Sequence, residues 1–252
     1  MPKIRVMPTL LFKDVGLVKG VAFDSWRRVG SAMQAVKVYN MREVDELVYL
    51  DITATSDGRP PDFETVDDLA DECFMPLTVG GGVRTVEHVR RLLKVGADKV
   101  AINSAAVEQP ALIREIADRF GSQCVVVSID ARRRADGTYE SYTHAGRRPV
   151  GKDPAVLAKD AEAMGAGEVL LTSIDRDGTL QGYDVELTRL VSDAVSIPVI
   201  ASGGAGTYAH MAEVLREGRA SAVAAASMYH FTEQTPLAAK QYLREAGFSV
   251  RL

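Results

Sequence analysis

Short apolar runs recur along the chain and alternate with stretches in which apolar residues repeat at the longer period of a helix. The runs lie at residues 4–11, 47–52, 77–79, 99–103, 124–130, 169–174, 199–202 and 222–227. Most are apolar throughout, which is typical of strands buried on both faces. Between them apolar residues fall three or four positions apart, as at Val86, Val89, Leu92 and Leu93, or at Leu187, Leu190 and Val191. Strands that alternate with amphipathic helices predict a parallel sheet.

The chain also repeats itself at a constant shift of 122 positions, which relates Glu46 to Glu168. The same shift relates Asp62 to Asp184, Glu64 to Glu186, Asp71 to Asp193, Pro76 to Pro198, Gly81 and Gly82 to Gly203 and Gly204, Thr85 to Thr207, His88 to His210, and Gly96 to Gly218. Two four-strand halves close naturally into a barrel, whereas an open sheet has no reason to duplicate in this way. We therefore predict a single (βα)8 TIM barrel over residues 1–252, with half-barrels at about 1–122 and 123–252.

Length and composition agree with one ordinary globular domain. The chain has 252 residues, of which 46% are hydrophobic and 25% charged, and its formal net charge is −4. This balance disfavours a nucleic-acid binder, which needs clustered Lys and Arg in excess. We find no long apolar run and no export signal, and Cys73 and Cys124 have neither metal-ligand nor disulfide spacing. We therefore expect a cytoplasmic protein that needs no membrane, metal or cofactor.

Each half carries a glycine cluster after its third strand, Gly80-Gly81-Gly82 in one and Gly203-Gly204 in the other. Glycine lets a backbone N–H approach an anion closely, and the helix that follows adds partial positive charge. The next strand of each half ends in small residues, at 103–105 and 225–227, whose amides can complete such a cradle. Two cradles in register predict a ligand with a phosphate at each end, although one cluster alone could be only a tight turn.

Longer motifs give a resemblance that covers essentially the whole chain. The segments are LVKG at 17–20, DELVYLDITA at 45–54, TVGGGV at 78–83, GADKVAINSAAVE at 96–108, FGSQCVVVSIDA at 120–131, GAGEVLLTSIDRDGT at 165–179 and IPVIASGGAG at 197–206. The chain resembles the cyclase subunit of imidazole glycerol phosphate synthase. In that family the barrel receives ammonia from a class I glutaminase subunit and uses it on a bis-phosphorylated substrate.

The resemblance implies roles for individual residues at one end of the barrel. Asp130 ends the fifth strand and matches a catalytic aspartate, which can transfer protons; a structural carboxylate that caps a loop is the alternative. Lys19 lies in a long first loop, residues 12–30, which resembles a mobile lid that brings an ammonium to a phosphate. The implied substrate and phosphate site comprises Lys19, Gly81, Gly82, Asn103, Ser104, Thr172, Asp177, Gly178, Ser202, Gly203, Gly204, Ala226 and Ser227, of which Ser202 is a weaker match, as is Asp51.

At the opposite end, the resemblance implies an ammonia gate formed by Arg5, Glu46, Lys99 and Glu168. Four charges at strand starts are costly to desolvate unless they pair, so a closed ring is expected. A purely stabilising ring is the alternative, because that face of the barrel commonly serves stability. Asp98 and Gln123 match positions on the glutaminase-facing side, which implies a heterodimer.

One position departs from the family pattern. Leu11 stands where the family has its other catalytic aspartate, and Pro8 and Lys13 fix the register on both sides. A leucine cannot exchange a proton, and loss of one acid/base partner typically lowers the rate about 10² to 10⁴-fold. The substitution, with the runs LLFKDVGLVKGVAF and YTHAG, resembles a diverged branch that partners a glutaminase in converting an acetamido group of surface sugars to an acetamidino group.

Four functions therefore remain open from the sequence. The first is an ammonia-using barrel subunit with impaired ring closure that acts beside histidine synthesis, in sugar amidination. The second is a genuine histidine-pathway cyclase whose general acid lies elsewhere. The third is a non-catalytic activator that conducts ammonia from the glutaminase to another protein. A phosphoribosyl isomerase of the same superfamily is the fourth, although it has no need of the charge ring.

Overall fold

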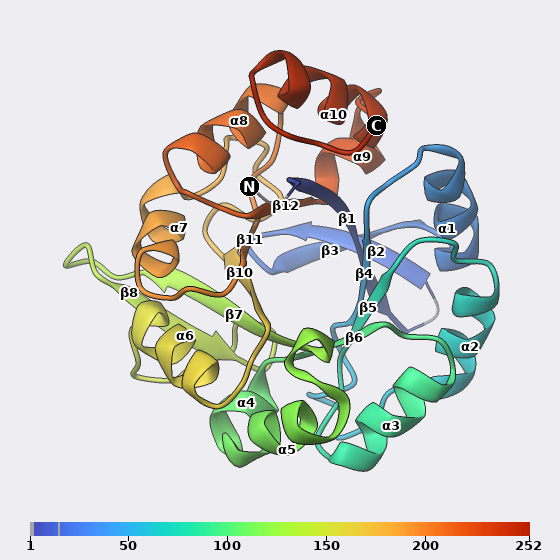
Figure 1. Ribbon diagram of the computed structural model, residues 1–252, viewed down its shortest axis with the longest axis vertical. Helices are drawn as coiled ribbons and strands as arrows, with labels where there is room; N and C mark the ends of the chain where they lie inside the picture. Colours follow the sequence, from blue (N-terminus) through green and yellow to red (C-terminus); the bar gives the residue numbers. More distant parts are fainter. Residues whose placement is uncertain (1–2, 15) are drawn as a thin grey trace.

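Strand β1 (Arg5–Lys13) pairs in parallel with a neighbour on each side, which closes the sheet into a barrel. Met7 aligns with Ala224 of β12 (Ala222–Ala225), and Leu11 aligns with Leu50 of β4 (Leu47–Asp51). The computed structural model describes residues 3–14 and 16–252, and within them eight parallel strands are ringed by helices (Figure 1). The ring continues from β4 through β5 (Leu77–Gly80), β6 (Lys99–Ile102), β7 (Val125–Arg133), β10 (Glu168–Ser173) and β11 (Val199–Ser202) to β12. The predicted (βα)8 barrel is confirmed.

The helices start at capping residues that repeat between the halves. Asp62 and Asp184 accept hydrogen bonds from the third helical amides of α2 and α7, and Thr85 and Thr207 do the same for α3 and α8. Such caps satisfy amides that have no partner inside the helix. The helices are α1 (Ala32–Met41), α2 (Phe63–Asp71), α3 (Val86–Lys94), α4 (Ser104–Glu108), α5 (Ala111–Phe120), α6 (Pro154–Ala163), α7 (Val185–Ser192), α8 (Tyr208–Arg216), α9 (Ser227–Phe231) and α10 (Pro236–Glu245).

The long first loop expected at residues 12–30 contains a β-hairpin, and Phe12 and Lys13 belong to β1. Strands β2 (Gly16–Val21) and β3 (Asp24–Gly30) pair antiparallel, and β2 also pairs with the end of β1. A second unpredicted hairpin extends β7 through β8 (Tyr139–Thr143) and β9 (Arg148–Pro149) and projects from the rim in Figure 1. The first hairpin was missed because β3 is exposed along most of its length and lacks an alternating apolar pattern, whereas β8 alternates in burial and was a usable signal.

Several predicted boundaries were wrong by one to three residues. Cys124 belongs to a short 3₁₀ turn, η1 (Ser122–Cys124), so β7 starts one residue later. Strand β12 ends at Ala225, and Ser227 begins α9, where the small residues let the chain turn. Leu190 was expected on the apolar face of its helix, but it is exposed, because the face of α7 that packs inward carries Leu187 and Val191.

The barrel interior is layered along its axis, because alternate residues of a strand point to the same side. On β1 the inward side chains are Arg5 at the start, then Met7, Thr9 and Leu11. The Met7 layer is apolar and consists of Met7, Val48, Ala101, Val126, Leu170, Ile200, Ala222 and Ala224. Charged residues therefore lie below an apolar layer, and polar residues lie above it.

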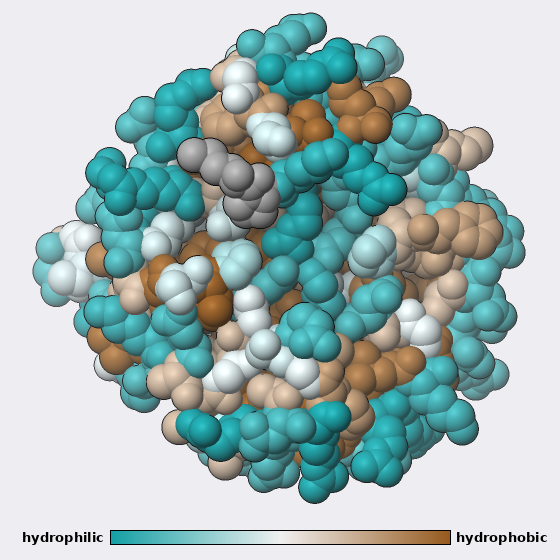
Figure 2. Space-filling view, viewed as in Figure 1, coloured by the Kyte–Doolittle hydropathy of each residue, from teal (hydrophilic) through white to brown (hydrophobic). Residues whose placement is uncertain are grey.

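Outside the barrel, hydrophilic residues cover most of the helical rim in the view along the axis (Figure 2). The two ends of the chain meet beside β1, where Ile4 N donates to Ser249 O at 2.7 Å. None of the helices within residues 3–14 and 16–252 has the length and hydrophobicity needed to span a membrane.

Candidate active site

A cavity of about 310 Å³ opens at the carboxyl ends of the strands, the face at which barrel enzymes bind their substrates. All the substrate and phosphate residues expected from the sequence line it, namely Lys19, Gly81, Gly82, Asn103, Ser104, Thr172, Asp177, Gly178, Ser202, Gly203, Gly204, Ala226 and Ser227. Asp130, Leu11 and Asp51 line it as well. The structure thus brings every one of these positions into a single cavity, while their roles stay predictions.

Asp130 is a buried carboxylate that lines this cavity from β7. Desolvation, and after it the negative charge of Asp177, raise its pKa to about 7. Asn103 Nδ2 donates to Asp130 Oδ2 at 3.3 Å and also bonds the carbonyl oxygens of Ser128 and Tyr142, which fixes the amide beside the carboxylate. A carboxyl group with a pKa near 7 can both accept and donate a proton at neutral pH.

Leu11 lies across the cavity from Asp130. Strands β1 and β7 are four places apart in the ring of eight described strands, so they are diametrically opposite. Thr9 precedes Leu11 on the same inward face, and its buried hydroxyl has no hydrogen-bond partner among the described residues. The wall opposite Asp130 therefore offers a methyl surface and one weakly acidic hydroxyl, and it has no carboxylate at position 11.

Lys19 is buried, and its ammonium group binds the carboxylate of Asp177. Lys19 Nζ lies 2.6 and 2.7 Å from the two carboxylate oxygens, and Ala22 N donates to the Asp177 carbonyl at 2.8 Å. These contacts hold the β2–β3 hairpin against the loop after β10. Burial, followed by the charge of Lys19, lowers the pKa of nearby His230 to about 4. The expected contact of Lys19 with a phosphate stays a prediction.

The two glycine cradles have matching backbone conformations. Gly81, Gly82, Gly203 and Gly204 all have positive φ angles, of 108°, 70°, 89° and 104°. A Cβ at Gly82 would lie 2.6 Å from a neighbouring carbonyl oxygen, and one at Gly204 would lie 2.1 Å from another, so neither position has room for a side chain. In the second cradle the hydroxyl of Ser227 is buried and has no hydrogen-bond partner among the described residues.

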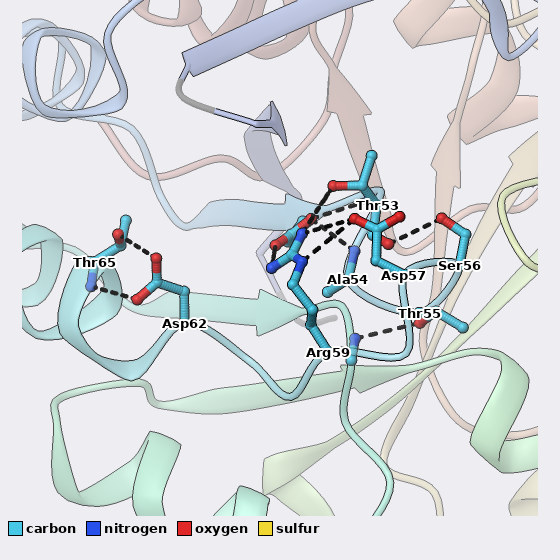
Figure 3. A network of polar contacts seen from close by, with 10 residues as sticks. Thr53, Ala54, Thr55, Ser56, Asp57, Arg59, Asp62 and Thr65 are labelled. Carbon is cyan, nitrogen blue, oxygen red and sulfur yellow. Dashed lines mark hydrogen bonds and ion pairs between the residues drawn. The ribbon is translucent and has the colours of Figure 1, made fainter.

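Asp51 has a local structural role within the cavity wall. One carboxylate oxygen accepts from Thr53 N, Thr53 Oγ1 and Ala54 N, and the other accepts from Arg59 Nη1 at 3.4 Å. Figure 3 shows the side chain of Arg59 turned toward Thr53 and Asp57 across this loop. The carboxylate thus orders the loop after β4.

Below the apolar layer, the four charges expected at the strand starts form a closed ring. Arg5 Nη1 binds Glu46 at 2.6 Å and Glu168 at 2.9 Å, and Lys99 Nζ binds Glu168 at 3.2 Å and Glu46 as well. We call these four residues the basal charge ring. Because each cation contacts both carboxylates, every charge is compensated. The predicted ring is present, whereas its function as a gate is a proposal.

The two residues expected to face a glutaminase lie beside the basal charge ring and are exposed. Asp98 immediately precedes Lys99, and its carboxylate accepts from Leu77 N at 2.8 Å. Gln123 precedes β7, and its amide donates to Phe120 O at 3.2 Å. Both lie at the strand starts, on the same end of the barrel as the ring.

Some cavity residues were not singled out from the sequence. Arg84, His144 and Trp26 line the cavity. Arg84 directly follows the TVGGGV motif, so its position was a usable signal, and His144 lies within the quoted run YTHAG. No comparable signal points to Trp26, because it reaches the cavity only through the unpredicted hairpin.

A buried carboxylate and two glycine cradles that line one cavity of a duplicated barrel agree with one known family. The family model described as "Histidine biosynthesis protein" matches residues 5–235. The chain belongs to this family. Members of the histidine biosynthesis family are isomerases or cyclases that share the TIM barrel, which is consistent with an enzyme. The match includes all eight barrel strands, both glycine cradles and the basal charge ring.

Proposed function

We propose that this chain is an ammonia-using barrel subunit of the imidazole glycerol phosphate synthase cyclase type. It works with a class I glutaminase and binds a bis-phosphorylated substrate at the carboxyl ends of the strands. Ring closure is impaired by Leu11, and the chain acts beside histidine synthesis, in the amidination of a sugar. Sequence resemblance to the diverged branch is the argument for the sugar.

One observation carries the proposal, namely the order of layers inside the barrel. A compensated charge ring lies at the strand starts, an apolar layer follows, and the cavity with Asp130 lies above. Neutral ammonia can cross an apolar layer far more readily than a charged ion, which would lose its hydration. An isomerase has no use for this order, because it needs no second substrate from below.

The chemistry of the cavity supports a proton-transferring role for Asp130. Addition of ammonia to a carbonyl needs a group that accepts a proton from nitrogen and then returns one to the departing water. Asp130 has a pKa of about 7 and can do both. The opposite wall carries Leu11, so a step that needs a second acid there is slowed.

A binding and turnover experiment tests the proposal. The doubly phosphorylated ribulosyl-formimino ribotide is titrated into the protein while the fluorescence of Trp26, the one tryptophan of the chain, is followed. Saturable binding, with slow ammonium-driven turnover, is expected. If the ligand does not bind, the bis-phosphate site is refuted.

A second measurement distinguishes an enzyme from a non-catalytic conduit for ammonia. The conduit is the competing function, because Leu11 replaces a catalytic carboxylate. The chain is mixed with a class I glutaminase, and glutamine hydrolysis and product amidination are assayed together. In the enzyme, Asp130→Asn abolishes amidination and leaves glutamine hydrolysis stimulated. In a conduit, Asp130→Asn leaves both unchanged.

A further inference from the structure

The two phosphate cradles have nearly the same backbone but different charge, and the difference is centred on Arg84. We call Gly81, Gly82 and Ser104 the first-half cradle, and Gly203, Gly204 and Ser227 the second-half cradle. After each glycine pair the chain makes the same turn: Arg84 N donates to His88 Nδ1 at 3.3 Å, and Gly206 N donates to His210 Nδ1 at 3.3 Å. Arg84 and Gly206 are therefore equivalent positions in the repeat.

The side chain of Arg84 lies between the cavity and the loop after β4. Its Nη2 donates to Thr55 O at 3.1 Å, and its Nη1 donates to Gly58 O at 3.4 Å. Both partners are neutral carbonyl oxygens, so these hydrogen bonds orient the guanidinium without neutralising its charge. In the same cradle Thr55 Oγ1 accepts from Gly82 N, a contact drawn as a dashed line to Thr55 in Figure 3. A fixed cation thus borders the first-half cradle.

The second half cannot hold a cation at the equivalent position. A Cβ built on Gly206 would lie 2.0 Å from the carbonyl oxygen of Leu180, which is the repeat equivalent of Gly58. In the second half the carbonyl oxygen of Leu180 lies directly against the backbone of Gly206. In the first half the side chain of Arg84 reaches the equivalent carbonyl oxygen, that of Gly58. Position 206 therefore has no room for a side chain that could take the place of Arg84.

The loop residues beside the two cradles also differ in charge. Thr55 of the first half is replaced in the second by Asp177, whose negative charge is offset by Lys19. His144 also borders the first-half cradle, and Ser104 Oγ accepts from its backbone amide at 3.1 Å. The acids on this side are Glu108, half exposed and 3.6 Å from His144 Nε2, and Asp51, whose carboxylate lies 3.4 Å from Arg59 Nη1. The first half keeps an arginine that lines the cavity and donates only to carbonyls.

We propose that Arg84 sets the orientation of the bis-phosphorylated ligand, by making the first-half cradle the stronger site for a phosphate monoester dianion. A guanidinium is well suited to a phosphate, because its donors match the spacing of phosphate oxygens. The duplicated backbone alone would bind either end of the ligand in either cradle. Arg84 removes this ambiguity, so that the reacting middle of an asymmetric ligand meets Asp130 in one orientation. This inference rests on the proposed function only in requiring that both cradles bind phosphate.

Inorganic phosphate tests the inference, because it has no ends of its own. It is titrated at constant ionic strength into ¹⁵N-labelled protein, and the amide resonances of Gly82 and Gly204 report the two dissociation constants separately. Gly82 is expected to saturate at about tenfold lower phosphate than Gly204, which is the worth of one charge-assisted hydrogen bond. Arg84→Gln should reduce this ratio to about one to two, and Arg84→Lys, which keeps the charge but loses the forked donors, should keep only part of it.

Arg90→Gln is the matched control, since it removes an exposed arginine from the same helix that follows the cradle and should leave the ratio unchanged. Thermal unfolding of each variant checks that it is folded. A wild-type protein in which Gly204 binds phosphate as tightly as Gly82 overturns the inference, and so does an unchanged ratio in Arg84→Gln. Such a result leaves the proposed function intact, because the latter fails only if the bis-phosphorylated ligand does not bind.

Discussion

The ammonium group of Lys19 and the carboxylate of Asp177 form a buried ion pair that joins the β2–β3 hairpin to the barrel, with Nζ 2.6 Å from the nearer oxygen. The two residues are 158 positions apart. The carboxylate of Asp177 also raises the pKa of Asp130. The ion pair therefore connects the position of the hairpin with the protonation of Asp130.

Loss of Lys19 should therefore loosen the hairpin and leave Asp177 buried without its cation. In Lys19→Met, amide hydrogen exchange at residues 16–30 is expected to quicken by at least about tenfold, because breaking one side of a buried pair costs a few kcal/mol. The double variant Lys19→Met with Asp177→Asn should recover part of the protection. If the single variant exchanges as slowly as wild type, the pair does not hold the hairpin.

The pH dependence of stability should reveal the burial of Asp130. Its folded pKa of about 7 lies above the unfolded value near 3.8, so the native state binds the proton more tightly. This stabilisation is complete below pH 4 and is lost as the pH rises to 7. Asp130→Asn removes the charge, and we expect it to exceed wild type in free energy of unfolding at pH 8 by up to ~4 kcal/mol.

Urea unfolding at pH 8 and at pH 4 measures this difference. The advantage of Asp130→Asn should shrink to near zero at the lower pH. An equal difference at both values would mean that Asp130 is not the titrating group, and Asp136→Asn, which changes an exposed carboxylate in the turn before β8, is the control.

The basal charge ring should contribute measurably to stability, unlike an exposed ion pair. Lys99→Met leaves Glu46 and Glu168 to share Arg5, and we expect it to lower the free energy of unfolding by about 2 kcal/mol. The matched control is Arg219→Met. Arg219 pairs with Asp193 at 2.7 Å but is 59% exposed, so its loss should cost under about 1 kcal/mol. Equal losses in urea unfolding would contradict a compensated, desolvated ring.

Alanine substitutions can test both the space around a cradle glycine and its backbone conformation. Gly204→Ala introduces a Cβ that would lie 2.1 Å from Gly182 O, whereas Gly137 has a similar positive φ with open space around it. Gly137→Ala should cost about 1 kcal/mol from backbone strain alone. Gly204→Ala should cost at least twice as much, about 2 kcal/mol or more, and should abolish phosphate binding at the second-half cradle. Phosphate binding that survives in Gly204→Ala would exclude that amide from the site.

The barrel and the glycine cradles were predictable because both depend on local periodicity and on a repeat, whereas Asp130, Lys19 and Asp177 were expected from the family resemblance. The inward residues of β1 follow from alternation along one strand, and the cradles follow from glycines that recur at one shift. The partner of Lys19 was not predictable, because ion pairs between distant loops leave no periodic pattern. The same holds for the orphaned hydroxyl of Thr9 and the carbonyl partners of Arg84, which depend on how loops pack after the barrel has closed.

Restoring a carboxylate at position 11 is the sharpest test of the cavity chemistry. Leu11 and Asp130 lie on opposite strands of the barrel, so Leu11→Asp places a second acid across the cavity from the first. If the remaining site is competent, ammonium-driven ring closure should rise by about 10² to 10⁴-fold, the usual contribution of one general acid or base. Leu11→Asn is the control, because it is polar and similar in size to aspartate but cannot transfer a proton. A rise in both variants would point to cavity polarity instead of proton transfer. If neither variant gains activity, further positions have diverged from cyclase chemistry, and a reaction on a different substrate becomes the favoured interpretation.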